Sequence, residues 1–257
     1  MKFTSILTAG ALVTAMVSPM VMADSTTSPE QKKEIEQIVH DYLVSNPEVL
    51  LEASQALQQK QQQNMQKEAK SAILGNADLL LGETLAVAGN PKGDVTLVEF
   101  FDYQCIHCKK MKPVVSELIK KDANLRVVFK EFPIFGKSSE IASRVALAAA
   151  MQGKYMQLQE VLLKMDKHLD KETVIQAAQS AGLNMAKLKI DMDSKAVTDV
   201  LDANRQLAEK MHLMGTPAFI VLATPGGKFK VDSEPAFIPG AATEEALQAL
   251  INKAAGK

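Results

Sequence analysis

The feature that most constrains the fold is a pair of cysteines placed between an apolar run and an amphipathic segment. Cys105 and Cys108 are the only cysteines in the 257 residues, and two residues separate them. The run from 95 to 101 predicts a buried strand, 106 to 121 a helix, and 125 to 132 a second strand. Strand, helix and strand in this order predict a parallel crossover. Both sulfurs should then lie at the start of its helix.

The rest of the chain predicts more helices than strands. From about 138 to 213 the apolar spacing is almost wholly helical. A strand is predicted over 218–222, a turn and a further strand over 226–231, and a closing helix over 243–253. We therefore expect an α/β, thioredoxin-like sheet with an inserted helical subdomain at about 138–213, all within a catalytic domain spanning 77–257.

The N-terminus predicts export. Lys2 precedes an apolar run from Ile6 to Met22 that ends in small residues at Ala23. This pattern is typical of a signal peptide, here residues 1–23 with cleavage after Ala23. The alternative is an uncleaved membrane anchor, but the run is short for a span and Pro19 interrupts it. Periplasmic localisation follows, and the cysteines would then lie in an oxidising compartment.

Residues 24–76 predict a helical segment of their own. Capping patterns at Ser28 and at Asn46, each followed by proline, indicate two helix starts. Each helix carries an apolar stripe with little of its own sequence to cover it. The segment either packs on its own domain, forms a solvated spacer ending in a polar linker, or pairs with another copy of the chain. We favour pairing, because a segment of this size buries little surface alone.

The net charge argues against nucleic acid as a partner. Lysine and arginine number 29 and aspartate and glutamate 30, for a formal charge of -1. No strong overall field therefore draws the chain to phosphate backbones.

The cysteine pair has the spacing that redox chemistry needs. A sulfur at a helix N-terminus meets unpaired N–H groups and the positive end of the helix dipole, which favour thiolate over thiol. Cys105 is thus the predicted nucleophile, and Cys108, one turn later, the residue that resolves a mixed disulfide. His107 can add positive charge or a hydrogen bond near the Cys105 sulfur. A pair whose reduced form is stabilised in this way is an oxidant.

Three other uses of the pair compete with redox chemistry. A structural disulfide closing so small a loop would contribute only about 2 kcal/mol, and the lysines that follow suggest surface rather than core. A zinc site lacks further ligands at suitable spacing, so we expect neither a metal nor a cofactor. Cu(I) needs only two thiolates and remains an alternative.

A carboxylate inside the first strand is the remaining candidate from chemistry alone. Glu99 lies six residues before Cys105 in an apolar run, where burying a charge is costly. It either points outward at the strand end or accepts a proton from Cys108 with a raised pKa. We favour the second role slightly. Lys130, in the second strand, is expected to be an ion-pair partner of some carboxylate.

Together these motifs resemble the bacterial DsbA-like thiol-disulfide oxidoreductases. The likeness rests on 98–108 with its Cys-Ile-His-Cys sequence, on Gly-Thr-Pro-Ala-Phe at 215–219, and on Pro-Gly-Ala at 239–241. The Asn-Pro-Glu-Val-Leu helix start at 46–50 resembles the N-terminal extension of the family's oligomeric branch. The resemblance implies a nucleophile at Cys105, a buried acid at Glu99, and a cis-proline loop at Thr216 and Pro217 that binds substrate.

Two departures from the monomeric oxidases of that family alter the expected activity. Ile106 stands where proline is usual, and Thr216 precedes the predicted cis-proline, as in disulfide isomerases. The resemblance thus implies an enzyme that forms and also isomerises disulfides in thiol-containing exported proteins. Its expected partners are a second copy in a homodimer and a membrane redox protein, either a quinone-linked oxidase or a reductase. A periplasmic chaperone or a copper-binding thioredoxin-like protein is the alternative function.

Overall fold

The computed structural model describes residues 28–82, 86–165 and 169–257, so the predicted signal peptide lies outside the described residues. The described chain divides into two compact units, one up to Gln58 and the other from Gln59 onward. Among these residues no helix combines the length and apolar character that a membrane span requires.

The first unit is helical, and the cap of its first helix is the one that the sequence predicts. Helix α1 runs from Pro29 to Ser45, and the Ser28 side chain accepts from the Gln31 N–H in a reciprocal capping box. The predicted cap at Asn46 is not found: Asn46 is the C-cap of α1, and its side chain donates to the Tyr42 carbonyl. Helix α2, Glu48–Gly75, starts in this unit and continues into the second. No residue of α1 is buried. Its apolar stripe is therefore not covered by any of the residues that the structure describes.

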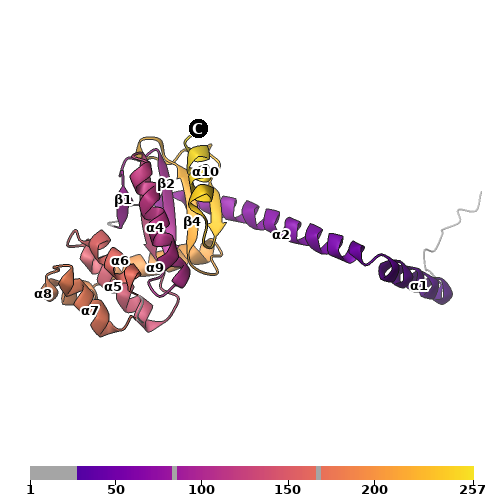
Figure 1. The fold of residues 1–257 in the computed structure, drawn as a ribbon, viewed down its shortest axis with the longest axis horizontal. Coiled ribbons are helices and arrows are strands. Elements are labelled where there is room, and N and C mark those ends of the chain that lie inside the picture. The colour runs from indigo at the N-terminus through magenta and orange to yellow at the C-terminus, as the bar shows by residue number, and fades with distance from the viewer. Residues whose placement is uncertain (1–27, 83–85, 166–168) are drawn as a thin grey trace, which may run out of the picture. The chain divides into compact units, whose positions relative to one another are not determined.

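The second unit is built on a mixed sheet of five strands (Figure 1). Strands β2 and β3 are parallel, with Val95 opposite Leu125 and Phe101 opposite Glu131. The other neighbours are antiparallel, in the spatial order β1-β3-β2-β4-β5. The strand bounds are β1 Val87–Gly89, β2 Val95–Phe101, β3 Leu125–Glu131, β4 Ala218–Ala223 and β5 Ala236–Pro239.

Alternate residues of β2, the central strand, belong to two separate hydrophobic cores, because successive side chains of a strand point to opposite faces of the sheet. Leu97 and Phe101 lie in the core that α4, Ile106–Lys121, and α10, Glu244–Ala254, cover. Val98 and Phe100 lie in the core on the other face, together with Ile73 from the end of α2. The last turns of α2 therefore belong to the fold of the second unit.

The helical insertion between β3 and β4 matches its prediction from the sequence. Figure 1 shows α5 to α8 gathered beside one end of the sheet. The remaining helix bounds are α3 Ala77–Leu81, α5 Lys137–Ala150, α6 Tyr155–Lys164, α7 Lys171–Ser180, α8 Met185–Asp191 and α9 Lys195–Lys210.

The structure corrects one predicted strand and adds another. Residues 228–231 are not a strand, and Val231 is exposed; the strand that pairs with β4 is β5, beginning at Ala236. Lysines alternate with apolar residues over 228–231, which imitates the pattern of a half-buried strand. Strand β1, which the sequence does not predict, is only three residues long and is too short to carry a periodic signal.

Candidate functional site

The two cysteines lie where the central strand leads into α4. Cys105 is the N-cap of α4, and its Sγ accepts from the Cys108 N–H at 3.4 Å. Both residues are free thiols and almost fully buried, with 2% and 1% of their surface exposed. The suggestion that the following lysines place the pair at the surface is therefore wrong. The cap position explains why the first sulfur, rather than the second, meets the helix N–H groups.

The pKa values of the two thiols are driven apart. The hydrogen bond from the Cys108 thiol, aided by Thr216 and by the backbone N–H groups of Cys108 and His107, lowers the pKa of Cys105 to about 5 against the opposing effect of burial. Burial, together with that shared hydrogen bond, raises the pKa of Cys108. At neutral pH the reduced pair therefore holds one thiolate, on Cys105, and one thiol, on Cys108.

Glu99 is buried beneath this pair, with only 4% of its surface exposed, so it does not point outward. Burial raises the pKa of its carboxyl to about 8, the charge on Cys105 adds to the shift, and Lys112 opposes it. The charge on Glu99 in turn raises the pKa of Cys108. The carboxyl can therefore exchange a proton near neutral pH, as proton transfer to or from Cys108 would require.

The loop before β4 contains Thr216 and Pro217 and contacts the sulfur of Cys105. The Thr216–Pro217 peptide bond is cis, as the resemblance implies. The Cys105 thiol donates to the Thr216 carbonyl at 3.2 Å, and Pro217 is buried. An apolar groove of about 400 Å³ continues from this loop, and it is lined in part by Met65, Ala69, Met211, Leu213, Met214 and Phe237.

His107 and Lys130 differ from their predictions in what they contact. His107 is exposed, and the described contacts give the Cys105 sulfur the backbone N–H of His107 and no bond from its ring. Lys130 is buried, has no ion pair with a described carboxylate, and donates to the Leu79 carbonyl at 2.9 Å. Burial lowers the pKa of Lys130 to about 8.

Sequence reasoning missed a second buried acid. Glu131, at the end of β3, accepts from the hydroxyls of Tyr103 at 2.8 Å and Tyr155 at 2.7 Å. Burial raises its pKa to about 8. Glu131 lies on the same face of the sheet as Glu99, because it is two residues after Phe129, the residue that pairs with Glu99. The available signal was an acid in the last three residues of each of two parallel strands, since the carboxyl ends of such strands meet at one edge of the sheet.

Asp102, also missed, fixes the loop around the cysteines. Its carboxylate accepts from the backbone N–H of Gln104 at 2.7 Å and of Ile134 at 2.8 Å, and from the Ser139 hydroxyl at 2.7 Å. These bonds join the end of β2 to the start of α5. The position of Cys105 therefore depends on a carboxylate that is fully buried but hydrogen-bonded.

Comparison with known proteins identifies the family. The model of the DSBA-like thioredoxin domain matches residues 96–252, which is more than half of the chain and includes the cysteines and the cis-proline loop. The chain belongs to the DsbA-like thioredoxin family. A second family model, the copper resistance protein ScsC N-terminal domain, matches residues 31–64. The predicted resemblance and the thioredoxin-like fold are thus confirmed.

Individual relatives include one DsbA protein and two proteins of other names. The structure of BcfH from Salmonella enterica Typhimurium is 35% identical, with a TM-score of 0.76, covering 88% of this chain and 96% of that one. Thiol:disulfide interchange protein DsbA of Bordetella parapertussis is 31% identical over 151 residues, 53% of this chain and 66% of its own length. Na(+)/H(+) antiporter NhaA 3 of Salinispora tropica is 25% identical over 137 residues, 52% of this chain. The chain matches only 21% of that antiporter's length.

Proposed function

We propose that this chain is a periplasmic thiol-disulfide oxidoreductase that forms disulfides in exported proteins and isomerises incorrect ones. The observation that carries the proposal is the unequal pair, with a thiolate favoured on Cys105 and a protonated thiol on Cys108. The favoured thiolate makes Cys105 the better leaving group and the better nucleophile at neutral pH.

In oxidation, the chain starts with a Cys105–Cys108 disulfide. A client thiolate attacks the Cys105 sulfur, a mixed disulfide forms, and Cys108 leaves and takes up a proton, with Glu99 as the proposed donor. A second client thiolate then attacks the client sulfur of the mixed disulfide and releases the Cys105 thiolate. The client loses two electrons and the pair gains two. A membrane redox partner, a quinone-linked oxidase, would restore the disulfide.

In isomerisation, the reduced chain acts without net electron transfer. The Cys105 thiolate attacks an incorrect client disulfide, and the released client thiolate attacks elsewhere in the client until it displaces Cys105. A membrane reductase would keep the pair reduced. The client backbone would lie against Thr216 and the cis-proline loop, with the apolar groove beside them taking side chains of the unfolded segment.

Isomerisation also motivates a role for the N-terminal unit. The exposed apolar stripe of α1 supports assembly through this segment, which we propose forms a homodimer. Residues 1–23 would be the signal peptide, cleaved after Ala23. The segment 24–76 would supply the assembly helices and linker, with its last turns packed into the core of the second unit, and catalysis would lie in 77–257. Two active sites in one assembly could then hold a client through successive exchanges.

Trapping tests the chemistry. Changing Cys108 to Ala removes the internal thiol that releases a mixed disulfide, so clients should accumulate bound to Cys105 and separate only after reduction. A client-binding chaperone would keep its clients after reduction, and this result would contradict the proposal. A Cys105→Ala variant, which retains the other thiol, is the matched control and should trap no client.

Refolding of a scrambled multi-disulfide client in a glutathione buffer tests isomerisation. We compare the mature chain from Asp24 with a chain that lacks residues 24–58. The truncation ends there because Ala69 and Ile73 lie in the core of the second unit. The mature chain should rescue the client, and the truncated chain should only oxidise thiols. If neither rescues it, the isomerase assignment is wrong.

Cu(I) binding is the second candidate, and the match to a copper resistance protein's N-terminal domain favours it. Two adjacent thiols suit Cu(I), a soft ion that accepts two-coordinate sulfur ligation. Anaerobic titration against a Cu(I) chelator should give one bound ion per chain, lost in both single cysteine variants. Retention of tight binding in either variant would exclude the pair as the ligands.

A further inference from the structure

A second groove, on the side of α4 opposite α10, begins beside the active cysteine. It has a volume of about 650 Å³ and lies between α4 and α6. Ile106, directly after Cys105, stands at one end and is 62% exposed. Its other lining residues are Lys109, Lys110, Lys112, Pro113, Ser116, Glu117, Lys120, Glu160, Leu163 and Lys164. The groove is separate from the apolar groove at the cis-proline loop.

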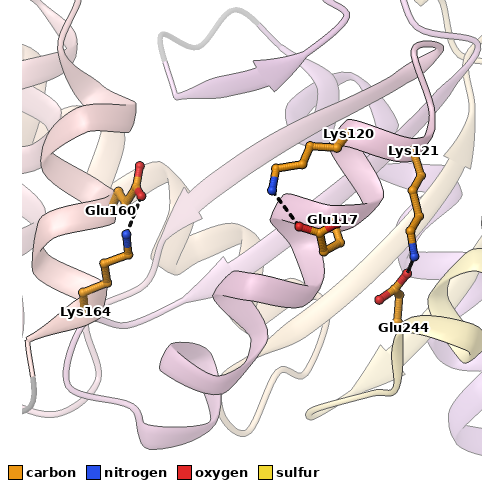
Figure 2. Close-up of polar contacts among 6 residues, drawn as sticks. All are labelled: Glu117, Lys120, Lys121, Glu160, Lys164 and Glu244. Carbon is orange, nitrogen blue, oxygen red and sulfur yellow. Dashed lines mark hydrogen bonds and ion pairs between the residues drawn. The ribbon is translucent and has the colours of Figure 1, made fainter.

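The charge of this groove differs from that of the whole chain. Five lysines and two glutamates line it, although the chain as a whole carries a formal charge of -1. Figure 2 shows where the two acids are used: Glu117 pairs with Lys120 on α4, and Glu160 pairs with Lys164 on α6, both at 2.6 Å. Lys121 turns away from the groove and pairs with Glu244 of α10.

The three lysines nearest the cysteines have no ion pair with a described carboxylate. Lys109 donates to the Met165 carbonyl at 2.5 Å, and Lys112 donates to the Gln159 side chain at 3.0 Å. Lys110 is exposed and has no described side-chain bond. Lys112 also interacts with the charges of Glu99 and Glu160. The positive charge without a described acidic partner at the end of the groove that meets the active site is therefore that of Lys109 and Lys110.

The dimensions suit an extended polypeptide rather than a small anion. From Ile106 to Lys120 the groove follows α4 for 14 residues, or about 21 Å at the rise of an α-helix. An extended chain covers that length in about six residues. Pro113 and Leu163 give the groove apolar surface between its charges.

We propose that this groove, which we call the lysine groove, docks an acidic segment of the client next to the cysteine undergoing exchange. The inference rests on the proposed function, since it supplies a client preference for the same reaction. Lysines at the surface would act mainly by raising the rate of encounter, an effect that salt screens. Clients with aspartate and glutamate within about six residues of a cysteine should therefore react faster than neutral ones.

The test uses the mature chain and three single-cysteine peptides of equal length with acidic, neutral or basic flanks. Rates of mixed-disulfide formation with the oxidised chain are measured at about 0.05 M and about 0.5 M salt. At low salt the acidic peptide should exceed the neutral peptide about tenfold, and the basic peptide should be slower than both. High salt should bring the three rates together.

Charge reversal identifies the surface responsible. A variant with Lys110→Glu, Lys120→Glu and Lys164→Glu should lose or reverse the ratio of acidic to neutral rates. The matched control is Lys189→Glu, Lys195→Glu and Lys253→Glu, which makes the same charge change at exposed lysines outside the groove and should keep the ratio. Using the ratio removes any change that the variants cause in the reactivity of the Cys105–Cys108 disulfide itself.

The outcomes separate the inference from the proposed function. If the neutral peptide does not exchange at all, the oxidoreductase proposal fails. If all peptides exchange without charge preference, or if both triple variants change the ratio equally, the lysine groove is not the docking surface and the oxidoreductase proposal stands.

Discussion

Every residue of β2 is buried, whereas α1 buries none, although both carry large apolar side chains. In α1 the apolar stripe stays about half exposed: Ile35 51%, Ile38 60%, Val39 50% and Tyr42 56%. Burying the rest of each would contribute on the order of 1 kcal/mol. Strand β2 is covered by other elements of its own chain, whereas the described part of the chain leaves the stripe of α1 exposed. The comparison suggests a catalytic unit that is complete alone and an N-terminal unit that needs another molecule.

Removing the nucleophile should have the largest effect on the catalytic unit. Cys105→Ala should reduce client oxidation on the order of 1000-fold or more, because the variant cannot form the Cys105–Cys108 disulfide that the client thiolate attacks. The loss should be the same in the mature chain and in the chain lacking residues 24–58. Stopped-flow oxidation of a dithiol peptide measures it. A truncated chain that is as inactive as Cys105→Ala would break the comparison, since catalysis would then need the N-terminal unit.

Removing the buried acid should have the next largest effect. Glu99→Gln should slow release of a mixed disulfide by Cys108 about 100-fold near neutral pH, the range typical of lost proton transfer. The measurement is the decay of a preformed mixed disulfide with glutathione. Glu131→Gln is the matched control, because it changes the other buried carboxyl on the same sheet face. Equal slowing in both variants would mean that the effect comes from the electrostatic field of the two buried carboxyls. Glu99 would then not be a specific proton acceptor.

The same contrast explains how much the sequence could predict. The strand around Glu99 and the helix after Cys105 were predictable with their bounds, because their apolar patterns are satisfied by neighbours in the same chain. The cis bond at Pro217 came only through family resemblance, since cis and trans prolines look alike locally. No local sequence pattern predicts which surface packs against the apolar stripe of α1.

The hydrogen-bonded cluster at Glu131 was not predictable for a different reason. Its partners come from three distant segments: Tyr103 after β2, Tyr155 at the start of α6, and Asn204 of α9, which donates to its backbone carbonyl. Each is an ordinary residue in its own segment. Only the packing of the helical insertion against the sheet brings them together, and spacing along the chain does not encode that packing.

The redox state should change how stability depends on pH. The pKa of Cys105 falls from 9.0 to about 5 on folding, so its thiolate stabilises the reduced folded chain above pH 9, and this contribution is lost as pH falls through about 5. The disulfide form lacks this group. The melting temperature of the reduced chain relative to the oxidised chain should therefore fall between about pH 8.5 and about pH 5.5.

Buried carboxyls act in the opposite direction but in both redox forms. Glu99 and Glu131 have pKa values raised to about 8, so their stabilising contribution is present below about pH 4.5 and is lost as pH rises through 8. Comparing the two redox forms at each pH largely cancels this contribution. A redox difference that does not change with pH, or that grows as pH falls, would contradict a stabilised Cys105 thiolate.

The smallest effect on catalysis should come from the N-terminal unit, and it tests the comparison most directly. Val39→Glu with Tyr42→Glu places two charges on the exposed stripe, which should lower the assembly mass to that of one chain, as measured by sedimentation. Dithiol oxidation should change less than about twofold, because the catalytic unit keeps its own core. Gln37→Glu with His40→Glu adds the same charge on the opposite face of α1 and should leave the mass unchanged. If the stripe variant keeps its mass, the stripe is a solvated surface, and the proposed route from assembly to isomerisation is lost.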